Sequence, residues 1–236
     1  MSPARKPLGH KVYGTIPHLS GSRLGPSDKK AEPGQELIAT KQARDWRDLV
    51  VVQEKLDGSN CAIAKLNGQV LALTRAGYQA HTSPYELHHR FADYVQQHRR
   101  RFDAALAEGE RWVGEWLALA HGTRYRLPHE PFVAFDIMRS GHQRAPYLEV
   151  LERCIRFELT QPRLIHLGQP VSIKNVLKRL EPSGHGALDA VEGAVWRVER
   201  DGRVDFLVKY VRPDKVDGKY LPEVSGQAAV WNVQDP

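Results

Sequence analysis

The stretch LVVVQEKLDGSNCAIAKL (residues 49–66) contains two apolar runs separated by the polar segment EKLDGSN (residues 54–60). Short apolar runs rich in β-branched residues on either side of an Asp-Gly dipeptide predict two strands joined by a tight turn. Lys55 stands between the first run and that turn. Two interpretations are open at this point: a solvated lysine of a surface hairpin, or an amine positioned for covalent chemistry.

Further runs of strand length follow, and two pairs of consecutive runs are joined by hairpin signals. LNGQ (residues 66–69) carries an Asn-Gly turn signal, and ERDG (residues 199–202) carries a second one. The further predicted strands are VLALTR (70–75), RWVGEWLAL (111–119), PFVAFDIM (131–138), EGAVWRV (192–198) and VDFLVKYV (204–211). Strands outnumber helices and follow one another in hairpin-connected runs, which predicts an α+β fold of antiparallel sheets with flanking helices.

Two segments are predicted to be helical. Residues 85–110 carry apolar side chains at helical spacing and predict one long helix. Residues 172–180 predict a short helix with Ser172 as its N-cap. Residues 1–40 are rich in Pro, Gly and Ser and predict an irregular N-terminal arm, followed by one domain over residues 41–236.

The composition limits the class of protein. Hydrophobic residues make up 41% of the 236 positions and charged residues 26%, the proportions of an ordinary soluble globular protein. No apolar run approaches the length of a membrane span, and the first residues lack a secretory signal. Two cysteines without metal-ligand spacing predict buried free thiols and a cytoplasmic protein. The net charge of +6 favours a polyanionic partner such as nucleic acid.

Five polar insertions on or beside the predicted strands carry the functional signal. They are Lys55 with Asp57-Gly58, Arg75 with Gly77, Glu115, Asp136, and Glu192, which is followed by the strand lysine Lys209. A charge inside a strand costs several kcal/mol unless it is paired, so these residues are expected to act together. A lysine nucleophile also needs desolvation or a cationic neighbour to lose its proton.

In order along residues 54–212, the patterns K-x-D-G-x-N, R-x-G, G-E-W, F-D, E-G-A-V and a strand lysine resemble the motif set of the covalent nucleotidyltransferases. This superfamily includes ATP-dependent DNA ligases, RNA ligases and mRNA capping enzymes. The resemblance implies a nucleotidyltransferase (ATP-grasp-like) ligase fold with a nucleotide pocket between the sheets. Details such as AHGTRYRLP (120–128) and KYVRPDKV (209–216) resemble the RNA-ligase branch of the phage enzyme that seals nicks in duplex RNA.

The resemblance implies a three-step reaction. Lys55 would attack the α-phosphate of ATP and form a lysyl-AMP, the AMP would pass to a 5′-phosphate, and a 3′-hydroxyl would displace it. The implied catalytic residues are Lys55, Asp57, Glu192 and Lys209. The implied nucleotide contacts are Glu54, Lys55, Asn60, Arg75, Glu115, Phe135, Asp136, Glu192 and Lys209. Glu54 keeps a second interpretation as a strand-end acid.

Within that set, Arg75 and Glu115 would hold the ribose hydroxyls, and Phe135 would stack on adenine or belong to the core. Lys209 would neutralise the α-phosphate. Mg²⁺ or Mn²⁺ would offset the triphosphate charge, with Asp57 and Glu192 as its expected ligands. Many family members carry K-x-K in the last motif. Here Lys209 stands alone, either as the first of the pair with Arg212 replacing the second, or as the second.

The expected partner is nucleic acid, namely RNA ends including nicked duplexes. Its expected contacts are Arg124, Arg126 and Arg212. In the alternative interpretation these side chains contact only solvent. The chain ends soon after the last motif, so no appended oligonucleotide-binding-fold domain is expected. We therefore expect a monomer that acts in RNA repair, either alone or with an accessory protein. Two alternatives stay open: a DNA ligase or capping-type guanylyltransferase, and an inactive fold that only binds nucleic-acid ends.

Overall fold

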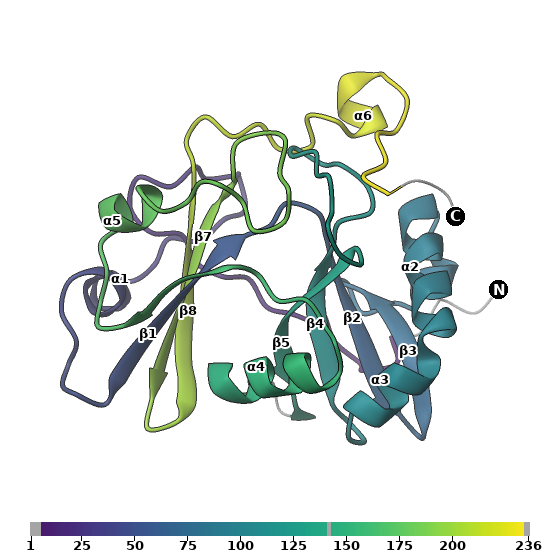
Figure 1. Cartoon of the computed structure of the whole chain (residues 1–236), viewed down its shortest axis with the longest axis horizontal. Coiled ribbons are helices and arrows are strands. Elements are labelled where there is room, and N and C mark those ends of the chain that lie inside the picture. The colour runs from purple at the N-terminus through teal and green to yellow at the C-terminus, as the bar shows by residue number, and fades with distance from the viewer. Residues whose placement is uncertain (1–5, 141–142, 234–236) are drawn as a thin grey trace. The chain divides into compact units, whose positions relative to one another are not determined.

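The computed structural model describes residues 6–140 and 143–233 (Figure 1), so the ends of the expected arm and domain lie outside the described residues. Contacts divide the chain into two compact units, each with one antiparallel sheet. Unit 1 consists of Met1–Gly14, Ser59–Ala118 and Pro131–Gln161, and unit 2 of Thr15–Gly58, Leu119–Glu130 and Pro162–Pro236. The domain expected over residues 41–236 is therefore distributed over both units.

The sheet of unit 1 has the strand order β3-β2-β4-β5. Its strands are β2 (Ser59–Leu66), β3 (Gln69–Thr74), β4 (Arg111–Trp116) and β5 (Phe132–Met138). Its helices are η1 (Ala80–Thr82), α2 (Glu86–Gln97), α3 (Arg99–Ala105) and α4 (Tyr147–Arg156). The predicted hairpin turn between β2 and β3 is confirmed, because Asn67 and Gly68 have φ angles of 51° and 69°, as an Asn-Gly turn requires.

An aromatic cluster joins α2 and α3 to one face of this sheet. The ring centroid of Phe91 lies 5.3 Å from that of Trp116 and 5.7 Å from that of Phe132. The single helix predicted over residues 85–110 is wrong, because α2 ends at Gln97 and α3 begins at Arg99. At the break, Nδ1 of His98 lies 2.9 Å from the carbonyl oxygen of Tyr94 and competes with helical hydrogen bonding.

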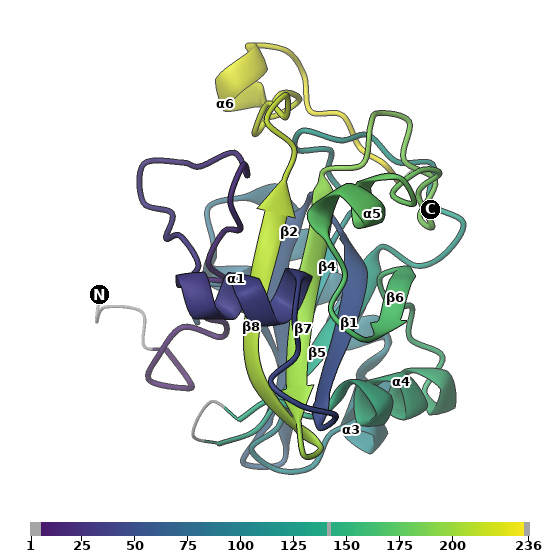
Figure 2. The ribbon, with the colours of Figure 1, turned by 90° about the vertical axis from the view of Figure 1, so that its left-hand side faces the viewer.

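The sheet of unit 2 has the strand order β6-β1-β7-β8. Its strands are β1 (Asp48–Lys55), β6 (Leu164–Gly168), β7 (Gly193–Arg200) and β8 (Arg203–Val211). Its helices are α1 (Pro33–Thr40), α5 (Ile173–Leu177) and α6 (Pro222–Ser225). Figure 2 shows α1 lying across β7 and β8, which it contacts. The predicted N-cap of α5 is confirmed: the Ser172 side chain accepts a hydrogen bond from the Asn175 N–H.

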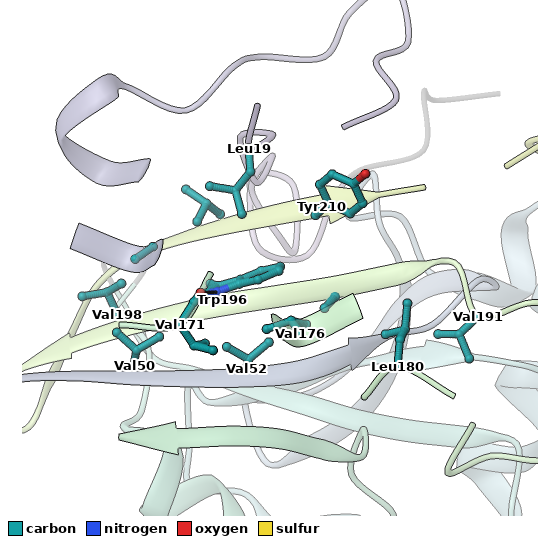
Figure 3. Close-up of a cluster of buried hydrophobic side chains, with 13 residues drawn as sticks. Leu19, Val50, Val52, Val171, Val176, Leu180, Val191, Trp196, Val198 and Tyr210 are labelled. Carbon is teal, nitrogen blue, oxygen red and sulfur yellow. Dashed lines mark hydrogen bonds between the residues drawn. The ribbon is translucent and has the colours of Figure 1, made fainter. Parts of the chain in front are cut away.

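A hydrophobic cluster covers one face of the unit 2 sheet (Figure 3). Trp196 is fully buried at its centre, and its indole N–H donates to the Val171 carbonyl at 3.1 Å. Val50 and Val52 of β1 belong to the same cluster. Side chains alternate along a strand, so Lys55 lies on the opposite face of β1 from these valines.

Part of the arm that was expected to be irregular has regular structure. Pro33–Thr40 forms α1, which begins with a proline and a capping box, both helix-start signals. Residues 17–23 run along β8. There the Lys209 N–H donates to the Pro17 carbonyl at 2.9 Å, and the Leu19 N–H donates to the Lys209 carbonyl at 2.8 Å. The arm therefore extends the unit 2 sheet at the residue that the last motif singles out.

Candidate active site

Lys55 is the last residue of β1, and its amine lies 2.5 Å from Oε2 of Glu192. The side chains are 21% and 7% exposed, respectively. Lys55 pairs across the sheet with Gly193, the first residue of β7. A Cβ at Gly193 would lie 1.9 Å from the carbonyl oxygen of Tyr210, so only glycine lets β7 and β8 approach here. The predicted nucleophile and a predicted acid thus meet at one end of the unit 2 sheet.

Asp57 organises the loop that follows Lys55. Its Oδ2 accepts hydrogen bonds from the Gly122 N–H at 2.9 Å and the Thr123 hydroxyl at 3.1 Å. The same oxygen lies 2.7 Å from the amine of Lys215, whose side chain is only 7% exposed. The Asp57 N–H donates to the Tyr125 hydroxyl at 3.1 Å. Three contacts therefore fix the carboxylate in place, and the bond to Tyr125 fixes the backbone beside it.

Two acid–base pairs lie next to each other: Lys55 with Glu192, and Asp57 with Lys215. Burial raises the pKa of Glu192 above its ordinary value of 4.5, and repulsion from Asp57 adds to the rise. The ammonium groups of Lys55 and Lys215 oppose it. A carboxylate with a raised pKa that contacts an amine is suited to accept a proton from that amine.

Lys209 lies on the same face of the unit 2 sheet as Lys55. Lys55 pairs with Gly193, and Gly193 pairs with Val211, so these three positions share a face. Lys209 precedes Val211 by two residues and shares that face as well. Burial lowers the pKa of His18, and the charges of Lys209 and Lys55 lower it further, which places both amines within electrostatic reach of one imidazole.

Glu54 lies on the opposite face of β1 from Lys55, because neighbouring side chains alternate. Its carboxylate accepts hydrogen bonds from the Ser183 hydroxyl at 2.6 Å, the Gly184 N–H at 2.9 Å and Nε of Arg163 at 3.2 Å. Protein donors thus engage both carboxylate oxygens. This arrangement favours an internal role for Glu54, and its contact with the adenine edge stays a prediction.

A pair of histidines continues the network around Glu54. The Arg163 N–H donates to Nε2 of His185 at 3.1 Å, so the hydrogen-bond network assigns the proton of His185 to Nδ1. Nδ1 then donates to Nε2 of His129 at 2.8 Å, and Nδ1 of His129 donates to the Glu130 carbonyl at 2.7 Å. Both rings are neutral in this arrangement, because a second proton on either would face an N–H group.

We expect this pair to make unit 2 sensitive to acid. Burial lowers the pKa of His185 from its ordinary value of 6.5 to about 4, helped by repulsion from His129 when that ring is protonated and from Arg163. The unfolded chain binds a proton below pH 6.5 and the folded chain does not, so stability falls as the pH drops from 6.5 to 4. The expected loss at pH 5 is about 2 kcal/mol. Urea unfolding at pH 7 and pH 5 measures it, and His185→Gln should reduce the difference.

In unit 1, Asn60 of β2 and Glu115 of β4 face each other across the sheet. The Asn60 Oδ1 atom is buried, and no donor of the described residues reaches it. A buried acceptor without a donor costs about 1–3 kcal/mol, so a ligand donor at this place would be stabilising. This feature fits a nucleotide, whose amino and hydroxyl groups are donors.

A β-bulge in β5 sets the directions of Phe135 and Asp136. Gly114 pairs with Ala134, whereas its neighbour Val113 pairs with Asp136, so Phe135 is the extra residue of the bulge. Asp136 therefore shares a face with Val113, opposite to the aromatic cluster under α2 and α3. Bulges of this kind re-aim side chains and are common beside active sites.

Asp136 is fully buried, and its Oδ2 accepts hydrogen bonds from the Tyr13 hydroxyl at 2.9 Å and from Nε of Arg144 at 3.0 Å. These contacts suit a carboxylate that orders its surroundings. Arg75 follows the end of β3 and is exposed, and its carbonyl accepts the Val12 N–H at 3.2 Å. The N-terminal segment thus contacts two of the unit 1 candidates, Arg75 and Asp136.

The arginines expected to contact nucleic acid differ in their surroundings. Nε of Arg124 lies 3.0 Å from Asp189, and Arg212 lies 2.9 Å from Asp214. Both are half-buried, whereas Arg126 is exposed. Their contact with nucleic acid stays a prediction.

A divalent metal would find few protein ligands here. Among the described residues there is no group of three or more metal-ligating side chains. Three donors already engage Oδ2 of Asp57, and the amine of Lys55 contacts Glu192. Mg²⁺ often keeps several waters and is bound by one or two carboxylates together with substrate phosphates. Glu192 fits that arrangement better than Asp57 does.

Lys215 is the residue of this cluster that the motif comparison did not assign. In one of the two interpretations of Lys209, Arg212 replaces a second lysine. Arg212 pairs with Asp214, however, whereas Lys215 is the buried cation beside Asp57. The Pro-Asp dipeptide at residues 213–214 is a turn signal in the sequence. It marks the return of the chain that brings Lys215 to Asp57.

The chain belongs to the RNA ligase family, whose model, described as RNA ligase, matches residues 48–211. The matched range contains every candidate catalytic residue and excludes the N-terminal arm, α1 and Lys215. Comparison with curated protein sequences gives no significant match. Among the described helices, none has the length and hydropathy needed to cross a membrane.

Solved structures with similar folds include RNA ligases. A Naegleria gruberi RNA ligase variant without ligand is 14% identical with a TM-score of 0.54, covering 96% of this chain and 64% of that one. Another variant of that ligase, with ATP and Mn, is 14% identical with a TM-score of 0.53, covering 84% of this chain and 59% of that one. An archaeal ATP-dependent RNA ligase is 21% identical with a TM-score of 0.44, covering 70% of this chain and 43% of that one. The chain thus spans less than two thirds of these proteins and has the ligase nucleotidyltransferase fold.

Proposed function

We propose that the chain is an ATP-dependent RNA ligase that acts through a covalent lysyl-AMP. The observation that carries the proposal is the contact between Lys55 and Glu192, with the pair of Asp57 and Lys215 beside it. A strand-end amine held against a buried acid has the two properties that a lysine nucleophile needs, a fixed position and a proton acceptor. Membership of the RNA ligase family supports the joining of RNA ends as the overall reaction.

In the first step the neutral amine of Lys55 attacks the α-phosphorus of ATP. A bond forms between Nζ and phosphorus, the bond to the bridging oxygen of the β-phosphate breaks, and pyrophosphate leaves with the electron pair. The amine starts as an ammonium group beside Glu192, so it has to lose a proton first. Glu192 accepts that proton, because it lies 2.5 Å away and burial raises its pKa.

Negative charge on the phosphates requires cations nearby. Lys209, on the same sheet face as Lys55, is the group proposed to contact the α-phosphate. Lys215 neutralises Asp57, so that this carboxylate does not repel the incoming phosphates. A bound Mg²⁺ or Mn²⁺, held largely by the phosphates and water, would neutralise further phosphate charge, and Glu192 in its unprotonated form would help hold it.

The adenosine is assigned to residues of unit 1. Asn60 offers a buried acceptor, and its cross-strand neighbour Glu115 offers a carboxylate for the ribose hydroxyls together with Arg75. Phe135 offers a ring for stacking on adenine. Asp136 in unit 1 and Glu54 in unit 2 are each engaged by internal hydrogen bonds and are not assigned a direct contact.

In the second and third steps the AMP passes to a 5′-phosphate, and a 3′-hydroxyl then displaces it and seals the strand. RNA repair, including the sealing of nicked duplexes, is the proposed role, with a monomer acting alone or with an accessory protein. Sealing assays on nicked and single-stranded RNA and DNA identify the substrate. Sealing of DNA but not RNA would assign the chain to the DNA ligases instead.

Incubation with ATP carrying a radioactive α-phosphate, together with Mg²⁺ or Mn²⁺, tests the first step. We expect a covalent label that survives denaturing electrophoresis and is released by acid, because phosphoramidate bonds are acid-labile. Labelling by GTP rather than ATP would favour a capping-type enzyme. If neither nucleotide labels the protein with either metal, the ligase proposal is wrong and a fold that only binds nucleic-acid ends is favoured.

Variants of the proposed ribose contacts should weaken labelling without abolishing it. Arg75→Ala and Glu115→Ala each remove one charged hydrogen-bonding group. The expected loss is about ten- to hundredfold at subsaturating ATP, the range for hydrogen bonds to charged groups. Arg100→Ala, on the exposed surface of α3, is the matched control and should label as the wild type does. Equal losses in all three variants would contradict the assignment.

A further inference from the structure

The segment HKVY (residues 10–13) belongs to unit 1 and packs there beside the proposed adenosine contacts. The N–H group of Val12, which is fully buried, donates to the Arg75 carbonyl at 3.2 Å. A Cβ at residue 77 would lie only 2.2 Å from the carbonyl oxygen of His10, and Gly77 has a φ of 94°. The loop of Arg75 therefore accommodates this segment only because residue 77 is glycine.

Tyr13 connects the same segment to the β-bulge. Its ring contacts Phe135 edge-on, with centroids 5.3 Å apart and planes at 68°, and its hydroxyl donates to Asp136 at 2.9 Å. The Arg144 guanidinium lies over the Tyr13 ring, 4.9 Å from its centroid. Tyr13 is only 5% exposed, so packing from several sides fixes its ring.

We propose that Tyr13 is a positioning residue of the adenosine site: its ring orients Phe135 for stacking, while its segment orients the loop of Arg75. The inference rests on the proposed function, since it concerns the nucleotide of that reaction. The family model begins at residue 48, so the segment lies outside the part of the chain that defines the family. In this proposal the arm contributes to the nucleotide site through Tyr13 and its neighbours.

Two substitutions separate the ring from the hydroxyl. Tyr13→Leu removes the ring and should raise the KM for ATP in lysyl-AMP formation about two- to tenfold, the range for one edge-to-face aromatic contact. The rate at saturating ATP should stay within about twofold, because Lys55 and Glu192 are untouched. Tyr13→Phe keeps the ring and loses the bond to Asp136, so it should lower the melting temperature and leave the KM close to that of the wild type.

A purely structural role for Tyr13 gives a different pattern, in which both variants contain less active protein and neither changes the KM. Tyr85→Leu, which replaces an exposed tyrosine of the same unit, is the matched control and should change neither quantity. An unchanged KM in folded Tyr13→Leu overturns the proposal. If that variant does not fold, Tyr13→Met fills the volume without a ring and carries the same expectation. Absence of lysyl-AMP in the wild type would instead reject the proposed function.

Discussion

Lys55→Arg is expected to lower lysyl-AMP formation at least about 1000-fold while the protein stays folded. Arginine keeps a positive charge against the buried Glu192, so the ion pair at the end of β1 is preserved. A guanidinium stays protonated at all accessible pH values and cannot act as the nucleophile. Covalent labelling from ATP measures the loss, and thermal unfolding shows that the fold is retained. Lys55→Ala should also abolish labelling, but it leaves Glu192 without its cation.

Lys65→Arg is the matched control for this substitution. Lys65 lies in β2, its side chain is 21% exposed like that of Lys55, and it contacts Asp103 at 2.8 Å. The same chemical change at the same exposure should leave labelling unaffected. Persistent labelling of Lys55→Arg, or an equal loss in Lys65→Arg, would show that Lys55 is not the nucleophile.

Asp57→Ala is expected to have the second-largest effect, because it acts on both stability and catalysis. The substitution leaves the buried Lys215 ammonium uncompensated and removes the acceptor of the Gly122 and Thr123 bonds. Breaking a buried ion pair on one side costs about 3 to 5 kcal/mol. We also expect labelling to fall at least about a hundredfold, since the loop after Lys55 loses its anchor.

The double variant Asp57→Ala/Lys215→Met separates these two effects. Removing both charges should recover part of the stability lost in Asp57→Ala, because no buried charge is left without a partner. It should not recover labelling. Asp214→Ala, at an exposed aspartate next to Lys215, is the control and should cost less than about 1 kcal/mol. Recovery of labelling in the double variant would show that Asp57 only compensates the charge of Lys215 and does not anchor the loop after Lys55.

Local signals in the sequence suffice for most of the sheets. Asn-Gly at residues 67–68 and Asp-Gly at 201–202 place two hairpins, and both are formed with positive φ at each turn residue. Apolar runs of strand length place seven of the strands. The short strand Leu164–Gly168 was not predicted, because its side chains are at most half-buried and show no apolar alternation.

The ion pairs of the candidate site depend on contacts between distant residues, which no local pattern encodes. Lys55 and Glu192 are in contact although 137 positions separate them in the sequence. Asp57 contacts Lys215, which lies in the loop that follows the last motif. The motif order identifies Lys55, Glu192 and Lys209 as candidates but not their pairing. Tyr13 had no sequence signal, because a single tyrosine in a proline- and glycine-rich arm has no periodicity.

The bulge at Phe135 determines which face of the unit 1 sheet Asp136 occupies, so this direction depends on the number of residues in β5 as well as on their identity. Because the bulge takes up Phe135 as an extra residue, Asp136 shares a face with Val113; the same residues in regular alternation would place Asp136 on the face of Phe132. A deletion of Phe135 would remove the bulge and leave Asp136 opposite Val113, so the buried acid would keep its environment. Alignments of related chains through residues 132–138 should accordingly allow a gap at Phe135, because residue parity determines which side chains reach the site.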